Sequence, residues 1–176
     1  TYTTAGTCPN SSSVSVTINA MDDASFSYSA AAFCVNESDP IATVTGLTGG
    51  MFSSSTGLSL NTATGTIDLS ASTPGTYSIT YTTAGTCPNS SSVSVTINAM
   101  DDASFNYSAA AFCVNESDPT ATITGLTGGT FSSTTGLALS ISTGTIDLSA
   151  STPGTYSVTY TTAGTCPNSS SVSVTI

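Results

Sequence analysis

The chain has 176 residues, ten acidic side chains and no Lys, Arg or His, which gives a formal net charge of −10. Without basic side chains it has no groups to neutralise phosphates, which excludes binding to nucleic acid or to anionic lipid headgroups. Catalysis by Ser-His-Asp or Cys-His pairs, by Schiff bases or by a P-loop lysine is excluded for the same reason. We therefore predict that the chain is not an enzyme.

The composition favours a folded protein over a disordered one. Apolar residues make up 38% of the chain and the mean hydropathy is +0.22, whereas disordered chains are usually highly charged and poor in β-branched residues. Ser (33) and Thr (35) are abundant, so solubility depends on hydroxyls and on charge of one sign. No apolar run approaches the ~18 residues of a membrane helix, and we expect no membrane insertion.

The chain is an internal repeat. The sequence TYTTAGTCPNSSSVSVTI occurs without change at 1–18, 80–97 and 159–176, and the three copies are evenly spaced. A fixed period is the signature of an array of structural units, and an array provides reach rather than catalysis. We place the unit boundary at the polar segment that follows Ile18 and Ile97. The predicted organisation is residues 1–20 as the C-terminal strands of a preceding repeat, followed by two repeats at 21–99 and 100–176.

Each repeat alternates apolar and polar residues with a period of two, which indicates half-buried β-strands. Val93, Val95 and Ile97 show this pattern, and turn-forming sequences such as Asp39-Pro40 and Gly49-Gly50 separate the apolar runs. The spacing predicts seven strands in the first repeat, over 24–28, 31–35, 41–46, 57–61, 65–70, 75–83 and 91–98.

About seven short strands in each repeat are typical of an immunoglobulin-like sandwich. The predicted fold class is therefore all-β, with tandem immunoglobulin-like antiparallel β-sandwiches. No stretch of the sequence has a convincing helical period.

The five cysteines allow two disulfide frameworks. One joins Cys34 to Cys87 and Cys113 to Cys166 inside the repeats, which leaves Cys8 with a partner upstream. The other joins Cys8 to Cys34 and Cys87 to Cys113 across the boundaries, which leaves Cys166 alone. The first framework is favoured because it resembles the bridge between the two sheets of a sandwich. Either one places the protein in an oxidising, extracellular compartment.

Clusters of carboxylates in each repeat make calcium the one cofactor to consider. Ca²⁺ takes several oxygen ligands, and an ion would stiffen a junction between repeats. The alternative is that these side chains are solvated charges that keep the surface soluble, with no cofactor bound. The candidate ligands are Asp22, Asp23, Glu37 and Asp39 in the first repeat and Asp101, Asp102, Glu116 and Asp118 in the second.

Several short motifs resemble a bacterial repeat family. They are Phe33-Cys34-Val35, Gly49-Gly50 with Phe52-Ser53-Ser54, Gly57-Leu58, Thr66-Ile67-Asp68-Leu69, and Pro74-Gly75-Thr76-Tyr77 through Thr80-Tyr81-Thr82 to Cys87. They are similar to the Ig-like repeats of giant secreted surface adhesins of Bacteroidota, of the gliding-motility-associated type. The resemblance implies a cell-surface or released fibrous protein, exported through the type IX pathway, and carries no catalytic residues.

We expect the chain to be a structural segment of a long extracellular adhesin or surface filament. Its expected partners are neighbouring repeats of the same protein, with self-assembly into a filament, and an exchange of strands by residues 1–20 is one form this could take. The alternative is a module that binds glycan or ice through regular threonine rows, such as Thr43 with Thr45 or Thr80 with Thr82.

Overall fold

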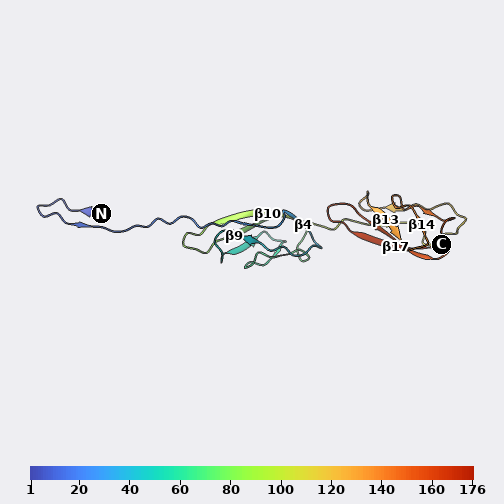
Figure 1. Ribbon diagram of the computed structural model, residues 1–176, viewed down its shortest axis with the longest axis horizontal. Helices are drawn as coiled ribbons and strands as arrows, with labels where there is room; N and C mark the ends of the chain where they lie inside the picture. The colour runs from blue at the N-terminus through green and yellow to red at the C-terminus, as the bar shows by residue number, and fades with distance from the viewer.

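The structure, a computed structural model, describes all 176 residues. Three parts follow one another along an elongated molecule (Figure 1): residues 1–20, here called the leading hairpin, then unit 1 (21–99) and unit 2 (100–176). The predicted fold class is confirmed, because the chain is all-β and its units are tandem β-sandwiches. No helix of the length and apolarity that a membrane crossing requires is present.

Unit 1 is built on one four-stranded sheet and two small ones. The large sheet has the strand order β4-β10-β9-β6, and the pairs β3-β5 and β7-β8 complete the second layer. The strands of unit 1 are β3 (Phe26–Ser27), β4 (Ala32–Cys34), β5 (Thr43–Val44), β6 (Met51–Ser54), β7 (Ser59–Leu60), β8 (Ile67–Asp68), β9 (Gly75–Thr82) and β10 (Ser90–Asn98).

Unit 2 repeats this arrangement with shorter pairing at its far end. The order β13-β16-β17 corresponds to β6-β9-β10, while the counterpart of β4 is reduced to a single bridge between Ala111 and Thr175. The strands are β11 (Phe105–Asn106), β12 (Thr122–Ile123), β13 (Thr130–Ser133), β14 (Ala138–Leu139), β15 (Ile146–Asp147), β16 (Thr155–Thr161) and β17 (Ser169–Thr175).

Each unit has a core of its own. In unit 1, Ile67, Leu69 and Ile79 are fully buried, and Tyr81 packs with Phe52 at a ring-centroid distance of 4.7 Å. The Tyr81 hydroxyl donates to the Leu47 carbonyl and accepts the Gly50 N–H, both at 2.8 Å, so its burial leaves no polar atom unpaired. The alternation of apolar residues along β9 and β10 therefore selects the face that packs against the second layer.

The seven predicted strands each overlap a strand of the structure, but the predicted count for unit 1 is one too low. The missing strand is β6, which pairs antiparallel with β9 from Met51↔Thr82 to Ser54↔Ile79. Only Phe52 of its four residues is buried, and the two apolar residues Met51 and Phe52 are adjacent, so the sequence shows no alternation there. Gly49 and Gly50 lie directly before it, so the local sequence is more typical of a turn than of a strand.

One strand pair departs from the predicted antiparallel sandwich. β4 pairs parallel with the end of β10, in the register Thr96↔Ala32 to Asn98↔Cys34. Both strands therefore run toward the same end of unit 1, the end that faces unit 2. This pairing places Cys34 beside Asn98, the last residue of the unit's final strand.

The leading hairpin lies outside both units and has no core. It contains only β1 (Tyr2–Thr3) and β2 (Ser11–Ser12), although its sequence is that of 80–97 and 159–176. Ile18 is 92% exposed, whereas its repeat equivalent Ile97 is 1% exposed. The same residues thus form long strands only where a sandwich is present to pair and bury them.

This contrast gives a prediction with a matched control in the same chain. Ile97→Ala should lower the free energy of unfolding by about 2–5 kcal/mol, because it opens a cavity in the core of unit 1. Ile18→Ala, the same change in the same local sequence, should leave that free energy unchanged. Urea denaturation of both variants measures the difference, and equal losses for the two would contradict the description of the leading hairpin.

Candidate functional site

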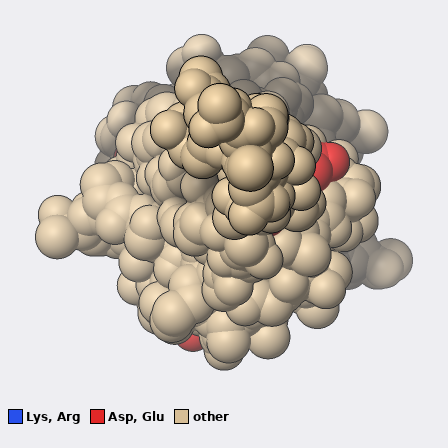
Figure 2. Space-filling view, turned by 90° about the vertical axis from the view of Figure 1, so that its left-hand side faces the viewer, with Lys and Arg blue, Asp and Glu red and all other residues tan.

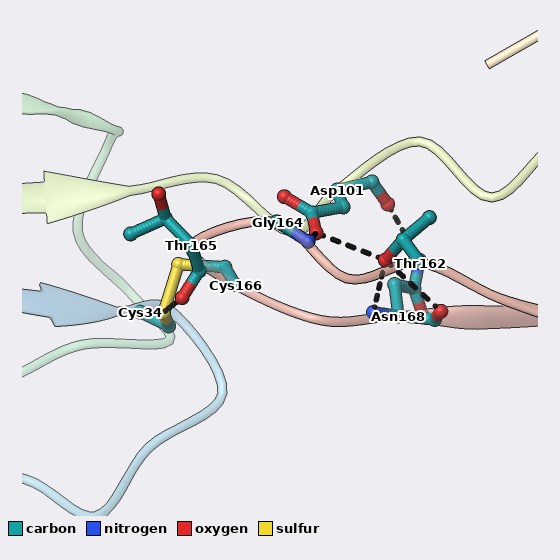
Figure 3. The surroundings of a disulfide bond; sticks show 7 residues. All are labelled: Cys34, Asp101, Thr162, Gly164, Thr165, Cys166 and Asn168. Carbon is teal, nitrogen blue, oxygen red and sulfur yellow. Dashed lines mark hydrogen bonds between the residues drawn. A yellow bond between two sulfur atoms is a disulfide. The ribbon is translucent and has the colours of Figure 1, made fainter. Parts of the chain in front are cut away.

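The region with the most distinctive chemistry is the junction between the two units. It consists of the end of β10, the linker residues 99–100, the first residues of unit 2 and a turn at 162–168 (Figure 3). We build it from its two sides, beginning with the turn.

The turn at 162–168 is held by one carboxylate. The Asp101 Oδ2 atom accepts the Thr162 hydroxyl at 2.9 Å and the Gly164 N–H at 3.0 Å, as Figure 3 shows. The Asn168 side-chain amide donates to the Asp101 carbonyl at 3.0 Å, and the Asp101 N–H donates to the Cys166 carbonyl at 2.9 Å. Asp101 therefore fixes the turn to the start of unit 2 and aims Cys166 at unit 1.

Unit 1 holds its own copy of this turn in the same way. Asp22 Oδ2 accepts the Thr83 hydroxyl at 2.9 Å and the Gly85 N–H at 3.1 Å, and the Asn89 amide donates to the Asp22 carbonyl at 3.0 Å. The Asp22 N–H donates to the Cys87 carbonyl at 2.9 Å. We call each set the aspartate clamp. The clamp lies at the N-terminal end of its unit, with a cysteine beside it.

The second cysteine of a unit lies at the opposite end. The register of β4 sets Cys34 beside Asn98, and the Val35 N–H donates to the Asn98 carbonyl at 3.1 Å. Immediately after the linker, Asp101 begins the clamp of unit 2. The chain therefore brings the C-terminal cysteine of unit 1 close to the N-terminal cysteine of unit 2.

These two cysteines are joined. Cys34 and Cys166 form a disulfide with a Cα–Cα distance of 5.6 Å and a sequence separation of 132. Both are buried, at 6% and 1% exposure. Across the junction the chain thus has two covalent connections, the linker at 99–100 and the disulfide, and a second connection opposes rotation about the first.

The structure does not contain the predicted disulfides. The expected bond of Cys34 to Cys87 would lie inside unit 1. However, Cys87 precedes the nine-residue strand β10, whereas Cys34 lies beside the last residue of that strand, so the two cysteines are at opposite ends of the unit. Such a strand spans roughly 30 Å, whereas a disulfide needs Cα atoms within about 7 Å. The same geometry separates Cys113 from Cys166. The pairing of Cys8 with Cys34 and of Cys87 with Cys113 is absent too, and these three residues, Cys8, Cys87 and Cys113, are free.

The eight predicted calcium ligands are not brought together. Asp22 and Asp101 serve the two clamps, while the exposed Asp39 accepts the Leu69 N–H at 2.9 Å. The Cys113 N–H donates to Glu116 at 3.1 Å, and Asp118 accepts the Leu148 N–H at 3.0 Å. No three acidic or cysteine side chains gather where they could hold a metal ion.

Hydroxyls and backbone N–H groups stabilise the charged form of several carboxylates, as basic side chains or metal ions do in other proteins. The Ser25 hydroxyl, and then its N–H, hold the pKa of Asp23 below its usual value, and Ser104 does the same for the pKa of Asp102. The Ala71 N–H and the Ser70 hydroxyl lower the pKa of Asp68. These exposed carboxylates are therefore ionised at neutral pH without a metal ion or a basic residue.

The remaining surface offers little to a small ligand. Figure 2 shows the end that carries the leading hairpin, where acidic atoms are few and scattered among uncharged ones. Each unit has a matching shallow hollow of about 270 Å³, lined in unit 1 by Tyr28, Ala31 and Val93 among others. Two wider hollows, of about 530 Å³ beside Asn61 and about 470 Å³ on the leading hairpin, are open to solvent as well. Ligand pockets bury most of the ligand's surface, and none of these hollows is enclosed.

The threonine rows proposed for glycan or ice are also partly occupied. Thr43 and Thr45 are exposed, but the Thr45 hydroxyl donates to the Ser25 carbonyl at 3.3 Å. The Thr80 hydroxyl is paired with the Ser92 hydroxyl at 2.8 Å. The module with a glycan or ice ligand stays a prediction that no contact in the structure strengthens.

The clamps are features of the site that sequence reasoning does not identify. Taken locally, Thr83, Gly85 and Asn89 are ordinary turn residues, and Asp22 is a candidate calcium ligand. The available signal is the strict recurrence of Thr-Ala-Gly-Thr-Cys-Pro-Asn with Met-Asp-Asp, but nothing local shows that these two segments meet.

Comparisons with known proteins give distant structural likenesses alone. No family model matches the chain, and no curated protein matches it. Among solved structures it is similar to mouse cadherin-23 EC22-24, at 16% identity over 87% of this chain and 63% of that one, with a TM-score of 0.38. It is also similar to protocadherin gammaB7 EC3-6 in a cis-dimer structure, at 16% identity over 98% of this chain and 56% of that one, with a TM-score of 0.39. A third similar structure is Drosophila N-cadherin EC1-4, at 16% identity over 82% of this chain and 46% of that one, with a TM-score of 0.37.

The chain spans about half to two thirds of the length of these structures. All are tandem extracellular repeats by name, but TM-scores below 0.5 support no inference about their ligands or partners for this chain. The resemblance to Bacteroidota adhesins is not tested by them and stays a prediction.

The junction disulfide predicts a change in shape when it is removed. In Cys34→Ser with Cys166→Ser, only the linker at 99–100 joins the units, so they should sample many relative orientations. Small-angle X-ray scattering should show a broader distribution of interatomic distances than for the unsubstituted chain. Cys87→Ser with Cys113→Ser, which removes two free thiols, should leave the scattering unchanged. Identical profiles for the two double variants, or a mapped Cys34–Cys87 peptide, would contradict the assigned bond.

The dispersed carboxylates predict indifference to calcium. The melting temperature should be the same in excess chelator and in millimolar Ca²⁺, because no group of acidic side chains is arranged to bind the ion. Differential scanning calorimetry on the oxidised chain measures this directly. A rise in melting temperature with Ca²⁺ that disappears in Asp101→Asn, but persists in Asp68→Asn, would instead show an ion at the junction.

Proposed function

We propose that the chain is a tension-carrying segment of an extracellular adhesion stalk or surface filament, of the kind found in the secreted adhesins of Bacteroidota. The observation on which the proposal rests is the Cys34–Cys166 junction, which joins two sandwiches end to end by two covalent connections. A flexible tether would need only the linker. A second connection is useful where the relative position of the units must be kept under tension.

The chemistry of the chain supports an extracellular location. Disulfides persist in oxidising compartments, and this one connects units instead of sealing a catalytic or metal site. The surface carries ten acidic groups and no basic ones, so repeats in an array repel one another sideways and stay separate.

The partners in this proposal are other repeats of the same protein. Residues 1–20 are then the last strands of a preceding unit, which explains why Val14, Val16 and Ile18 are exposed while their equivalents in β10 are packed. No residue of the chain is assigned a catalytic role, and no cofactor is required. Attachment to a surface is assigned to parts of the protein beyond these repeats.

The proposal is tested by pulling the chain from its two ends with optical tweezers. In the oxidised chain, tension passes from Cys34 through the disulfide to Cys166, so only residues 1–34 and 166–176 lie in the loaded path. Complete unfolding under force should therefore extend the chain to no more than roughly 160 Å, since an extended residue spans about 3.3–3.6 Å.

The matched control is Cys34→Ser with Cys166→Ser. Its loaded path also includes residues 35–165, the 131 residues that the disulfide otherwise bypasses, which should add roughly 450 Å of extension. Cys87→Ser with Cys113→Ser should behave like the unsubstituted chain. If the oxidised, unsubstituted chain releases the long extension, the junction does not carry the tension and the proposal fails.

A further inference from the structure

Two of the free cysteines are the repeat equivalents of the two bonded ones. Cys87 lies one repeat period before Cys166, and Cys113 lies one period after Cys34. One chain therefore shows each type of cysteine both in a junction and outside one. The two states allow a direct comparison of what a neighbouring unit covers.

Exposure follows the presence of a neighbour. Cys34 is 6% exposed and Cys166 1%, whereas Cys113 is exposed and Cys87 is partly exposed. Val114, beside Cys113, is 48% exposed, but its equivalent Val35 packs against the core of its own unit, so the comparison rests on the cysteines. The far end of unit 2 thus presents a thiol whose equivalent in unit 1 is covered at the junction.

At the N-terminal end of unit 1, the turn that carries Cys87 is already held in the shape that the junction requires. The clamp around Asp22 holds the turn of Cys87 with the same four contacts as the clamp around Asp101, at nearly identical distances. The turn therefore takes its shape without a disulfide. A second unit arriving at this end would find Cys87 already placed as Cys166 is.

We propose that Cys113 and Cys87 are junction sites for further copies of this unit. Cys113 bonds to the equivalent of Cys166 in the unit that follows, and Cys87 bonds to the equivalent of Cys34 in the unit that precedes. The partner at each end is another sandwich of the same kind, seated end to end as unit 2 is seated on unit 1. An array then carries one disulfide at every junction, each linking a unit to the next.

Each bond forms by thiol–disulfide exchange with a disulfide oxidant, such as oxidised glutathione or the disulfide of an oxidoreductase. One cysteine thiolate attacks the oxidant and releases its first thiol. The second cysteine attacks the resulting mixed disulfide and releases the other. Two S–H bonds and the S–S bond of the oxidant are lost, one S–S bond forms in the protein, and two electrons with two protons end on the two oxidant thiols.

Repetition of the bond creates a short covalent path through the array. From Cys87 the chain runs along β10 to Asn98, crosses the linker and continues through the start of unit 2 to Cys113. Because β4 is parallel to β10, and Ala111 pairs parallel with Thr175, this path runs in one direction through both units. A disulfide at each end would connect it to the next such path.

The path limits how far an array can stretch. The segment from Cys87 to Cys113 spans at most about 90 Å when fully extended, whereas the two repeats that it crosses would stretch to roughly 550 Å without the bonds. The disulfides therefore reduce the maximum extension about sixfold. Tension is carried by segments that are already extended along the molecule, and the folded layers beside them are bypassed.

The inference deepens the proposed function, and it rests on the same junction. Its test is a chain lengthened by one repeat, in which a second copy of residues 98–176 is appended after Ile176, so that three full units are present. After oxidation with a glutathione buffer, peptide mapping without reduction should find Cys113 bonded to the added copy of Cys166, together with the Cys34–Cys166 bond.

Two controls accompany the mapping. In the 176-residue chain, Cys113 should remain free and be alkylated at once, since no unit covers it. In the lengthened chain kept reduced, Cys113 should be alkylated as fast as in the 176-residue chain, because without the bond only a linker joins the third unit to the second. After oxidation it should resist alkylation, so this second measurement separates the effect of the bond from that of the added repeat.

The outcomes separate the two proposals. If Cys34–Cys166 forms while Cys113 stays free and rapidly alkylated, the repeated junction is wrong and the tension-carrying function of the present junction stands. If Cys113 bonds to Cys166 within unit 2, both the repeated junction and the assigned disulfide are wrong. If neither bond forms under oxidising conditions, the proposed function loses the observation on which it rests as well.

Discussion

The arrangement of the molecule depends on one short parallel pairing, that of β4 with the last residues of β10. It puts Cys34 beside Asn98 at the end of unit 1, while the clamp of Asp101 holds Cys166 at the start of unit 2. Along the chain, only the linker at 99–100 separates Asn98, beside the first cysteine, from Asp101, which holds the second. Since each cysteine is fixed by backbone contacts of its own unit, the disulfide joins two prepared sites instead of distorting either unit.

The threefold recurrence of one sequence shows how far local sequence determines this structure. At 80–97 and 159–176 it forms the longest antiparallel pairings of the chain, but at 1–18 it forms two strands of two residues each. Tyr81 and Tyr160 are buried where Tyr2 is 72% exposed. β-propensity is the same in all three copies, so the neighbouring strands and a second layer decide the outcome.

The sequence is sufficient for the elements that depend on alternation and insufficient for those that depend on contact between distant segments. The apolar rows of β9 and β10 are predictable because Tyr77, Ile79 and Tyr81 alternate with polar residues. β6 is not, because Phe52 is its single buried residue. The predicted cysteine pairing fails for a further reason: a bridge within a unit suits the sequence spacing, while the direction of β4 sends Cys34 to the far end. The carboxylates can be recognised in the sequence, but their hydroxyl and N–H donors lie up to 63 residues away.

A chain without basic residues must hold its carboxylates by other donors, and this explains where its one disulfide lies. Inside each unit the buried polar side-chain atoms all have hydrogen-bond partners, and two separate apolar clusters stabilise the sandwiches. The units therefore do not need an internal bridge. Between them no apolar cluster spans the junction and no ion pair can form, so neither the hydrophobic effect nor charge attraction can keep the units aligned. A covalent bond is the interaction that remains, and it is found there.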